Sequence, residues 1–248
     1  MLPRLFSIFV FMNIDNFEKL FGEKRPPSNH NREIKIDTDV HKLINSSWHR
    51  NWMQGLELKD DDHLKAITFL NKAIQENPNH SNLWRSRASI KQDYGDYNGS
   101  IDDYKRVLIL GSDWYVHYFQ LGYNFIRLQD FKKGLIALDI SIKLKEEMDK
   151  YTHLGPYYFL NIVKRVDSEV LYNNRAIAKQ GVKDFKGALE DTIMSTKINP
   201  QYSNAYYVRS LCYLLMKEKE KAFNMMKKAA QKGHLEAIAD LRTFFPGQ

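Results

Sequence analysis

Cysteine is nearly absent from this sequence, since Cys212 is the single cysteine in 248 residues. One cysteine cannot form an intrachain disulfide, and it excludes zinc sites built from several thiolates. We expect Cys212 to be a small buried hydrophobic residue. The eight histidines are scattered, and no HExxH pattern places two of them on one helix face. We therefore expect no metal and no cofactor.

Long apolar runs are also scarce. The N-terminal stretch Leu5–Ile14, "LFSIFVFMNI", is shorter than the roughly 20 residues that a membrane-spanning helix needs. It resembles the core of a signal peptide, but no small-x-small cleavage site follows it. Translation from Met12 instead of Met1 would give an ordinary amphipathic opening. We expect a cytoplasmic protein without a membrane partner, and export through Leu5–Ile14 is the alternative.

Charge of one sign is not concentrated anywhere. The chain has 37 basic and 30 acidic residues, a formal net charge of +7, but the two signs are interleaved. The run "KEKEK" from Lys217 to Lys221 is typical of a solvated helix surface. Nucleic acid is therefore an unlikely partner.

The sequence does contain an internal repeat. The small residues Ala66, Ser100, Gly134, Ala188 and Ala222 follow one another at steps of 34, 34, 54 and 34. The same steps separate two further columns, one aromatic (Trp84, Tyr118, Tyr172, Tyr206) and one small (Ala88, Gly122, Ala176, Ser210), each at 34, 54 and 34. The one long step equals the period plus an insertion of 20 residues. Independent columns that share a period and an interruption indicate a repeat architecture.

These columns resemble those of the tetratricopeptide repeat (TPR) family, whose period is 34 and whose pattern is W-x2-L-G-x2-Y, then A-x3-F, then P. Trp84, Ala88 and Tyr97 carry this pattern in the second repeat, and Pro200 ends the fourth. The resemblance implies an all-α fold, a right-handed α-solenoid of about five helix-turn-helix hairpins. The repeats lie near 47–80, 81–114, 115–146, 169–202 and 203–232. The first helix of the first repeat, around Trp52 and Gly55, is degenerate.

Within each hairpin, the pattern predicts an ion pair. Arg87 and Arg175 precede the small residue of a first helix, and Asp103 and Asp191 follow 16 residues later. We predict the pairs Arg87–Asp103 and Arg175–Asp191, and exposed unpaired charges are the alternative. In the fifth repeat Arg209 faces Met225, so that no such pair can form.

The ends and the insertion complete the predicted organisation. Residues 1–46 form an N-terminal segment, with a short helix at Asn13–Phe21 followed by a linker. The insertion at 147–168 lengthens the helices on both sides of Gly155-Pro156, and its tip Tyr157–Phe159 either contacts a partner or folds back onto the array. Residues 233–248 form a capping helix. Its inward residues are predicted to be Leu235, Ile238, Leu241 and Phe245.

In the TPR family, the first helices line a concave groove that binds extended peptides or a partner helix. The resemblance places the following residues in that groove: Asn82, Arg85, Ser86, Ser89, Phe119, Gln120, Tyr123, Arg127, Asn173, Asn174, Ile177, Asn204 and Tyr207. Co-chaperone members hold a chaperone's C-terminal carboxylate with a clamp of lysine, asparagine and arginine. The columns of that clamp hold Arg85 and Ser89, then Gln120, then Val170 and Asn174 in this sequence, so we do not expect the clamp here.

We predict a non-enzymatic scaffold that binds a protein or peptide, with no small-molecule substrate. One alternative is an enzyme or an enzyme-associated regulatory subunit, which needs a nucleophile and base or paired carboxylates within hydrogen-bond reach. His117 flanks the groove, but a satisfied or solvated histidine is the simpler interpretation. The run "DDDH" at Asp60–His63 falls in a turn and is more typical of a solvated loop than of a metal site. A second alternative is a self-assembling structural protein with an uncapped hydrophobic end.

Overall fold

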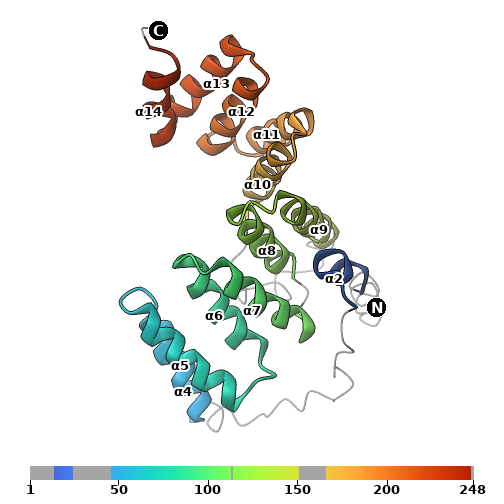
Figure 1. The fold of residues 1–248 in the computed structure, drawn as a ribbon, viewed down its shortest axis with the longest axis vertical. Coiled ribbons are helices and arrows are strands. Elements are labelled where there is room, and N and C mark those ends of the chain that lie inside the picture. Colours follow the sequence, from blue (N-terminus) through green and yellow to red (C-terminus); the bar gives the residue numbers. More distant parts are fainter. Residues whose placement is uncertain (1–13, 25–45, 113, 151–165, 247–248) are drawn as a thin grey trace. The chain divides into compact units, whose positions relative to one another are not determined.

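The computed structural model describes residues 14–24, 46–112, 114–150 and 166–246. These residues form α-helices and no strand, and consecutive helices such as α4 and α5, α6 and α7, α10 and α11, and α12 and α13 pack together in pairs (Figure 1). The predicted all-α solenoid of helical hairpins is thus confirmed. The predicted tip Tyr157–Phe159, residues 1–13 and most of the predicted linker lie outside the described residues.

The chain divides into two compact units between Leu128 and Gln129. The helices of the first unit are α2 (Ile14–Phe21), α4 (Ser47–Glu57), α5 (His63–Glu76), α6 (Ser81–Asp93), α7 (Tyr97–Ile109) and α8 (Tyr115–Arg127). Those of the second unit are α9 (Phe131–Asp149), α10 (Ser168–Gly181), α11 (Phe185–Ile198), α12 (Ser203–Leu215), α13 (Lys219–Gln231) and α14 (Leu235–Phe244).

Small residues lie where the helices of a hairpin cross. Ala88 of α6 and Ser100 of α7 are fully buried, and the Ser100 hydroxyl donates to the Ala88 carbonyl at 2.8 Å. In α4 the small residue is Gly55, where an added Cβ would lie 2.9 Å from Leu70 Cγ and 3.1 Å from the Ala66 carbonyl oxygen. Gly55 precedes Ala66 by 11 residues, whereas Ala88 precedes Ser100 by 12. This one-residue difference explains why the first helix of the first repeat does not follow the columns.

Three turns between consecutive helices have the same construction. Gly95, Gln129 and Lys183 each have a positive φ, between 61° and 84°, and end the preceding helix in the left-handed region. An aspartate follows each of them and caps the next helix: Asp96, Asp130 and Asp184 accept a hydrogen bond from the backbone N–H three residues later, at 2.9 to 3.1 Å.

Both predicted ion pairs are confirmed. The guanidinium of Arg87 donates two hydrogen bonds to Asp103, at 2.9 and 2.6 Å, and Arg175 does the same to Asp191, at 2.9 and 2.7 Å. A lysine one turn further along the first helix joins each pair. Lys91 lies 3.0 Å from Asp103 and Lys179 lies 2.9 Å from Asp191. Because both aspartates are buried, these bonds satisfy groups that would otherwise be costly inside the protein.

The same arginines also join neighbouring hairpins. Arg87 donates to Asn71 of α5 at 2.6 Å, and Arg175 donates to Asp139 of α9 at 3.0 Å. In the fifth repeat, Arg209 instead donates to the Thr192 carbonyl at 2.6 Å and to the Thr196 hydroxyl at 2.7 Å, both on α11. The predicted absence of an acidic partner in that hairpin is confirmed.

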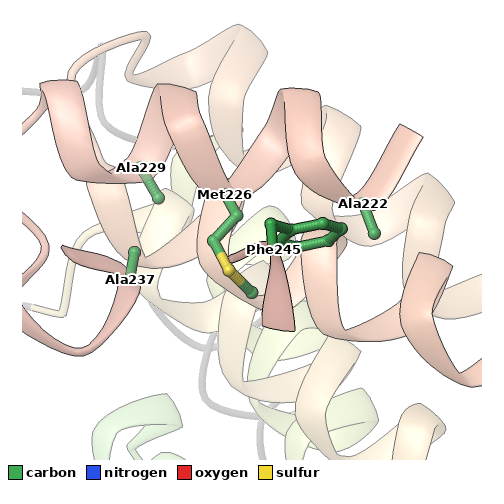
Figure 2. Close-up of a cluster of buried hydrophobic side chains, with 5 residues drawn as sticks. All are labelled: Ala222, Met226, Ala229, Ala237 and Phe245. Carbon is green, nitrogen blue, oxygen red and sulfur yellow. The ribbon is translucent and has the colours of Figure 1, made fainter. Parts of the chain in front are cut away.

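The second unit ends in a small hydrophobic core around α13 and α14. Figure 2 shows Met226 of α13 lying against the ring of Phe245, with Ala229 and Ala237 facing each other beside it. Leu241 packs against the same cluster, as predicted, but Leu235 and Ile238 do not, since they are 77% and 40% exposed. That part of the prediction was wrong because Ala237 takes the inward position, so the residues beside it point to solvent.

The prediction that the insertion lengthens the helices on both of its sides is wrong for α10. Helix α9 has 19 residues against 13 in α7, so it is longer than its counterpart. Helix α10, however, begins at Ser168, because Asp167 has an extended backbone (φ −69°, ψ 147°). An extended residue at that point ends the helical hydrogen-bond pattern.

The N-terminal helix α2 packs onto the first unit. Phe17 and Leu20 are buried, and Lys105 of α7 lies over the Phe21 ring, 5.2 Å from its centroid, and pairs with Glu23. Among the described residues, no helix has both the length and the apolar character needed to cross a membrane.

Candidate functional site

One stripe of side chains runs along the first helices of the first unit. Positions separated by three or four residues lie on one face of a helix. We call the stripe formed by α6 and α8 the α6–α8 face; it consists of Asn82, Arg85, Ser86, Ser89 and Gln92 of α6 and Val116, Phe119, Gln120, Tyr123 and Ile126 of α8.

Two side-chain hydrogen bonds show that this face is continuous across neighbouring first helices. The Gln92 Nε2 donates to Gln120 Oε1 at 3.0 Å, joining α6 to α8. The Trp52 indole N–H of α4 donates to the Ser86 hydroxyl at 3.0 Å. The Gln92 Oε1 is buried and has no hydrogen-bond partner among the described residues. This oxygen lies near the C-terminal end of α6 and is shielded from solvent.

The C-terminal end of α8 is built from aromatic rings and one arginine. Tyr123 contacts Tyr97 edge to face, with ring centroids 6.5 Å apart. Arg127 lies over the Tyr97 ring and donates from Nε to its hydroxyl at 3.0 Å. The predicted groove residue Arg127 is thus exposed at the margin of the face, whereas Phe119 is buried at 8% exposure.

Helix α8 also carries a buried histidine, His117. His117 is 2% exposed, and its Nδ1 lies 2.7 Å from the Ser112 carbonyl oxygen. A carbonyl can only accept, so Nδ1 carries the hydrogen and Nε2 is left as a buried acceptor that has no partner in the part of the chain that the structure describes. Burial lowers the pKa of His117 to about 4, and the positive charge of Arg85 lowers it further in the same direction. Burial also lowers the pKa of Arg85 itself. His117 is therefore neutral at physiological pH.

The second unit carries a corresponding stripe, the α10–α12 face. It consists of Val170, Asn173, Asn174, Ile177 and Gln180 of α10 and Asn204, Tyr207, Val208, Leu211 and Leu214 of α12. Much of it is already engaged. Asn173 is 3% exposed, and Asn174 donates to the Val170 carbonyl of its own helix at 2.9 Å. Ile177 packs against a buried cluster, and Asn204 is exposed.

Tyr207 is occupied by the capping helix. Its hydroxyl donates to Asp240 of α14 at 2.8 Å, and its ring stacks on His234 with centroids 4.2 Å apart. Burial, together with the hydrogen bond to Asp240, raises the pKa of Tyr207 to about 12. Tyr207 is therefore engaged within the second unit.

Sequence reasoning missed the contribution of α4 and of Gln92. Trp48 and Trp52 stack with ring centroids 6.4 Å apart, and His80 lies 5.0 and 5.6 Å from them. The helix carrying the two tryptophans does not follow the repeat columns, so only the tryptophans themselves could have drawn attention to it. Gln92 also occupies a groove position of the family pattern. In the later repeats the equivalent residues are Ile126, Gln180 and Leu214, so the position shows no constant residue type.

The remaining candidate groups have structural roles. Cys212 is fully buried, as predicted, and burial raises the pKa of its thiol to about 11. Asp62 caps α5 by accepting from the Lys65 N–H at 3.0 Å, and His63 stacks on Tyr94 at 3.6 Å. Within the described ranges, no group of three or more histidine, cysteine or carboxylate side chains could hold a metal ion.

The fold is shared with solved structures. YrrB, a TPR protein with an unusual peptide-binding site, superposes with a TM-score of 0.61, covering 82% of this chain and 97% of YrrB at 17% identity. This chain has the TPR fold. MamA from Desulfovibrio magneticus RS-1 superposes with a TM-score of 0.63 at 10% identity, covering 76% of this chain and 96% of MamA. The type IV pilus biogenesis factor PilW superposes with a TM-score of 0.59 at 16% identity, covering 82% of this chain and 96% of PilW.

No protein-family model matches the sequence, and neither does any curated protein. At these low identities the matches establish the TPR fold alone. Function in a TPR array depends on the residues of its faces, because one fold supports many different partners.

Proposed function

We propose that this protein is a non-enzymatic TPR scaffold that binds a peptide or protein partner on its first-helix faces, chiefly on the α6–α8 face. The observation that carries the proposal is the row of polar side chains on that face that keep some exposure to solvent. Its polar side chains Ser86, Gln92 and Gln120 are partly exposed, and Ser89 is exposed. By contrast, Tyr207 and Asn173 of the α10–α12 face are engaged or buried.

The shifted pKa values support a scaffold rather than an enzyme. The lowered pKa of His117 and the raised pKa of Cys212 follow mainly from burial in the helix interfaces. An enzyme would be expected to place such groups together in an open cleft. We further propose a cytoplasmic location, which fractionation of cells expressing the natural protein would test.

A display selection tests the binding function directly. The full chain would be immobilised and offered a random library of 12-residue peptides, and enriched peptides would then be measured by fluorescence polarisation. We expect binding that is weakened about tenfold by the double replacement Gln92→Ala and Gln120→Ala, because both side chains present amide groups to the ligand. If no peptide is enriched, or if the enriched peptides bind the variant equally well, the α6–α8 face is not the binding site.

A further inference from the structure

The excess positive charge of the chain is carried by its second unit. Residues 129–248 contain 20 basic and 14 acidic residues, whereas residues 1–128 contain 17 and 16. The two signs are interleaved along the sequence, so the excess forms no basic run. Whether it gathers on one surface depends on where the fold of the second unit places the lysines.

Three helix ends of the second unit meet at one edge. Gly181, the last residue of α10, lies beside Phe131, the first residue of α9, because an added Cβ on Gly181 would overlap the Phe131 ring. Ala188 of α11 and Cys212 of α12 belong to one buried cluster, which brings the start of α11 beside the end of α12. The start of α9, the turn from α10 to α11 and the turn from α12 to α13 therefore line the same edge.

This edge is rich in lysines. We call it the lysine edge and define it by six exposed residues: Lys132, Lys133, Lys183, Lys186, Lys217 and Lys219. The turn between α4 and α5 in the first unit has the opposite character, since Asp60 and Asp61 are exposed there. Lysines that are separated in the sequence are thus brought together by the hairpin topology.

The acidic groups at this edge do not balance the lysines. Asp130 and Asp184 cap α9 and α11, and Glu218 pairs with Lys221. Glu220 is the fourth carboxylate, so the edge has seven lysines against four acids when Lys221 is included. Lys133 lies 3.6 Å from Asp130, whereas the other five lysines that define the edge form no ion pair within the described residues.

Two large apolar side chains lie among these lysines. Leu215 ends α12 and is 56% exposed, and Met216, 38% exposed, follows it directly before Lys217. Exposed apolar side chains beside lysines are typical of surfaces that bind anionic lipid, where the apolar groups enter the headgroup boundary. The aromatic residues of the edge, Phe131 and Phe185, are partly buried and offer no open stacking platform for single-stranded nucleic acid.

We propose that the lysine edge binds an anionic membrane surface, with Leu215 and Met216 entering the headgroup region. The edge belongs to the second unit and the α6–α8 face to the first, so the inference is independent of the proposed peptide binding. It reverses the expectation from the sequence that a membrane is not a partner. That expectation considered a spanning segment and the linear order of charges, and neither describes a surface assembled from separate turns.

Vesicle flotation with the full chain tests the inference. We expect the protein to float with vesicles of phosphatidylcholine and phosphatidylserine but not with vesicles of phosphatidylcholine alone, and binding should weaken as salt is raised. Absence of flotation with the anionic vesicles would overturn the inference. Binding to poly-uridine RNA without binding to vesicles would also overturn it, and would identify nucleic acid as the ligand of the edge.

Two matched variants locate the binding surface. The edge variant carries Lys183→Gln, Lys186→Gln, Lys217→Gln and Lys219→Gln. The control variant removes the same charge at exposed lysines far from the edge, with Lys143→Gln, Lys197→Gln, Lys227→Gln and Lys228→Gln. We expect the edge variant to lose more than about 100-fold in affinity for anionic vesicles and the control variant less than about fivefold, because the attraction falls off within a Debye length. Equal losses would show that net charge, and not the lysine edge, governs binding.

A second pair of variants tests the apolar contribution. Leu215→Ser with Met216→Ser keeps every charge and should weaken binding to anionic vesicles about tenfold. Ile193→Ser with Met194→Ser removes an exposed apolar pair from the middle of α11 and should leave binding unchanged. Circular dichroism confirms that all variants fold. Equal binding by the two serine variants would contradict the insertion of Leu215 and Met216.

Discussion

Replacing His117 with leucine should remove an acid-sensitive weak point from the first unit. His117 is buried and neutral, and its Nε2 has no hydrogen-bond partner within the described ranges. The same position of the repeat holds Leu83 in the second repeat and Leu171 in the fourth, and both are buried. Leucine therefore suits the site, although the hydrogen bond to the Ser112 carbonyl is lost.

The magnitude follows from the lowered pKa. The pKa of His117 falls from 6.5 to about 4 because burial disfavours the charged form. Between these values the unfolded chain binds more protons than the folded one, so the free energy of unfolding falls as the pH falls from about 6.5 to about 4. The full effect is about 3 kcal/mol, and about 2 kcal/mol of it appears between pH 7 and pH 5.

Urea titration at several pH values measures this effect. All four tryptophans of the chain lie before residue 129, so their fluorescence follows the unfolding of the first unit. We expect the stability of His117→Leu relative to the natural protein to rise by about 2 kcal/mol on going from pH 7 to pH 5. Other titrating groups, including His80, whose pKa is also lowered by burial, act in both proteins and cancel in this difference. A difference that stays constant over this range would refute the reasoning.

Two further substitutions test the packing. Asp191→Ala removes the buried carboxylate that Arg175 and Lys179 share, and should lower the free energy of unfolding by about 3 kcal/mol. The control Asp102→Ala, at an exposed aspartate, should lower it by less than about 0.5 kcal/mol. Thermal unfolding followed by circular dichroism measures both variants, and an equally small loss of stability in the two would show that the ion pair is unimportant. Gly55→Ala forces a Cβ against Leu70 and should cost about 1–3 kcal/mol, although alanine favours helix, while Gln54→Ala on the exposed side should be neutral. Urea unfolding followed by tryptophan fluorescence measures the stability of Gly55→Ala and Gln54→Ala. A Gly55→Ala protein more stable than the natural one would contradict the close approach of α4 and α5 at Gly55.

The sequence was sufficient to predict the helical hairpins because the signal is repeated. Each column of small or aromatic residues occurs several times, so an individual deviation does not hide the period. The pairs Arg87–Asp103 and Arg175–Asp191 were predictable for the same reason, since the spacing of 16 residues occurs in two hairpins. Lys91 was not identified as a third member, because its approach to Asp103 depends on the direction of a long flexible side chain.

Features that occur once were harder to predict. Helix α4 departs from the columns by one residue, which became clear only from the contact of Gly55 with α5. The inward face of α14 was predicted with Leu235 and Ile238, but small Ala237 lies inward because Met226 and Phe245 already fill the core. Size complementarity of this kind depends on the neighbouring element and is not visible in one helix.

The candidate site shows the same division. The family pattern identified the helix positions that form the face, including Ser86 and Gln120. It could not show that Asn173 is buried, because burial depends on the side chains of adjacent helices. The groove positions themselves remain predictions for the peptide-binding measurements.

The aspartate turns have a consequence for how the chain folds. At Asp96, Asp130 and Asp184 the start of a helix is fixed by a bond to a backbone group only three residues away. Contacts so local cost little loop entropy, so helices can begin to form in order of synthesis without waiting for distant partners. In the turn before α13, Lys217 also has a positive φ, but Glu218 stands in place of the aspartate. The Glu218 side chain makes no capping hydrogen bond to α13. The α12–α13 hairpin therefore depends more on its packing against α14, through Ala237 and Phe245.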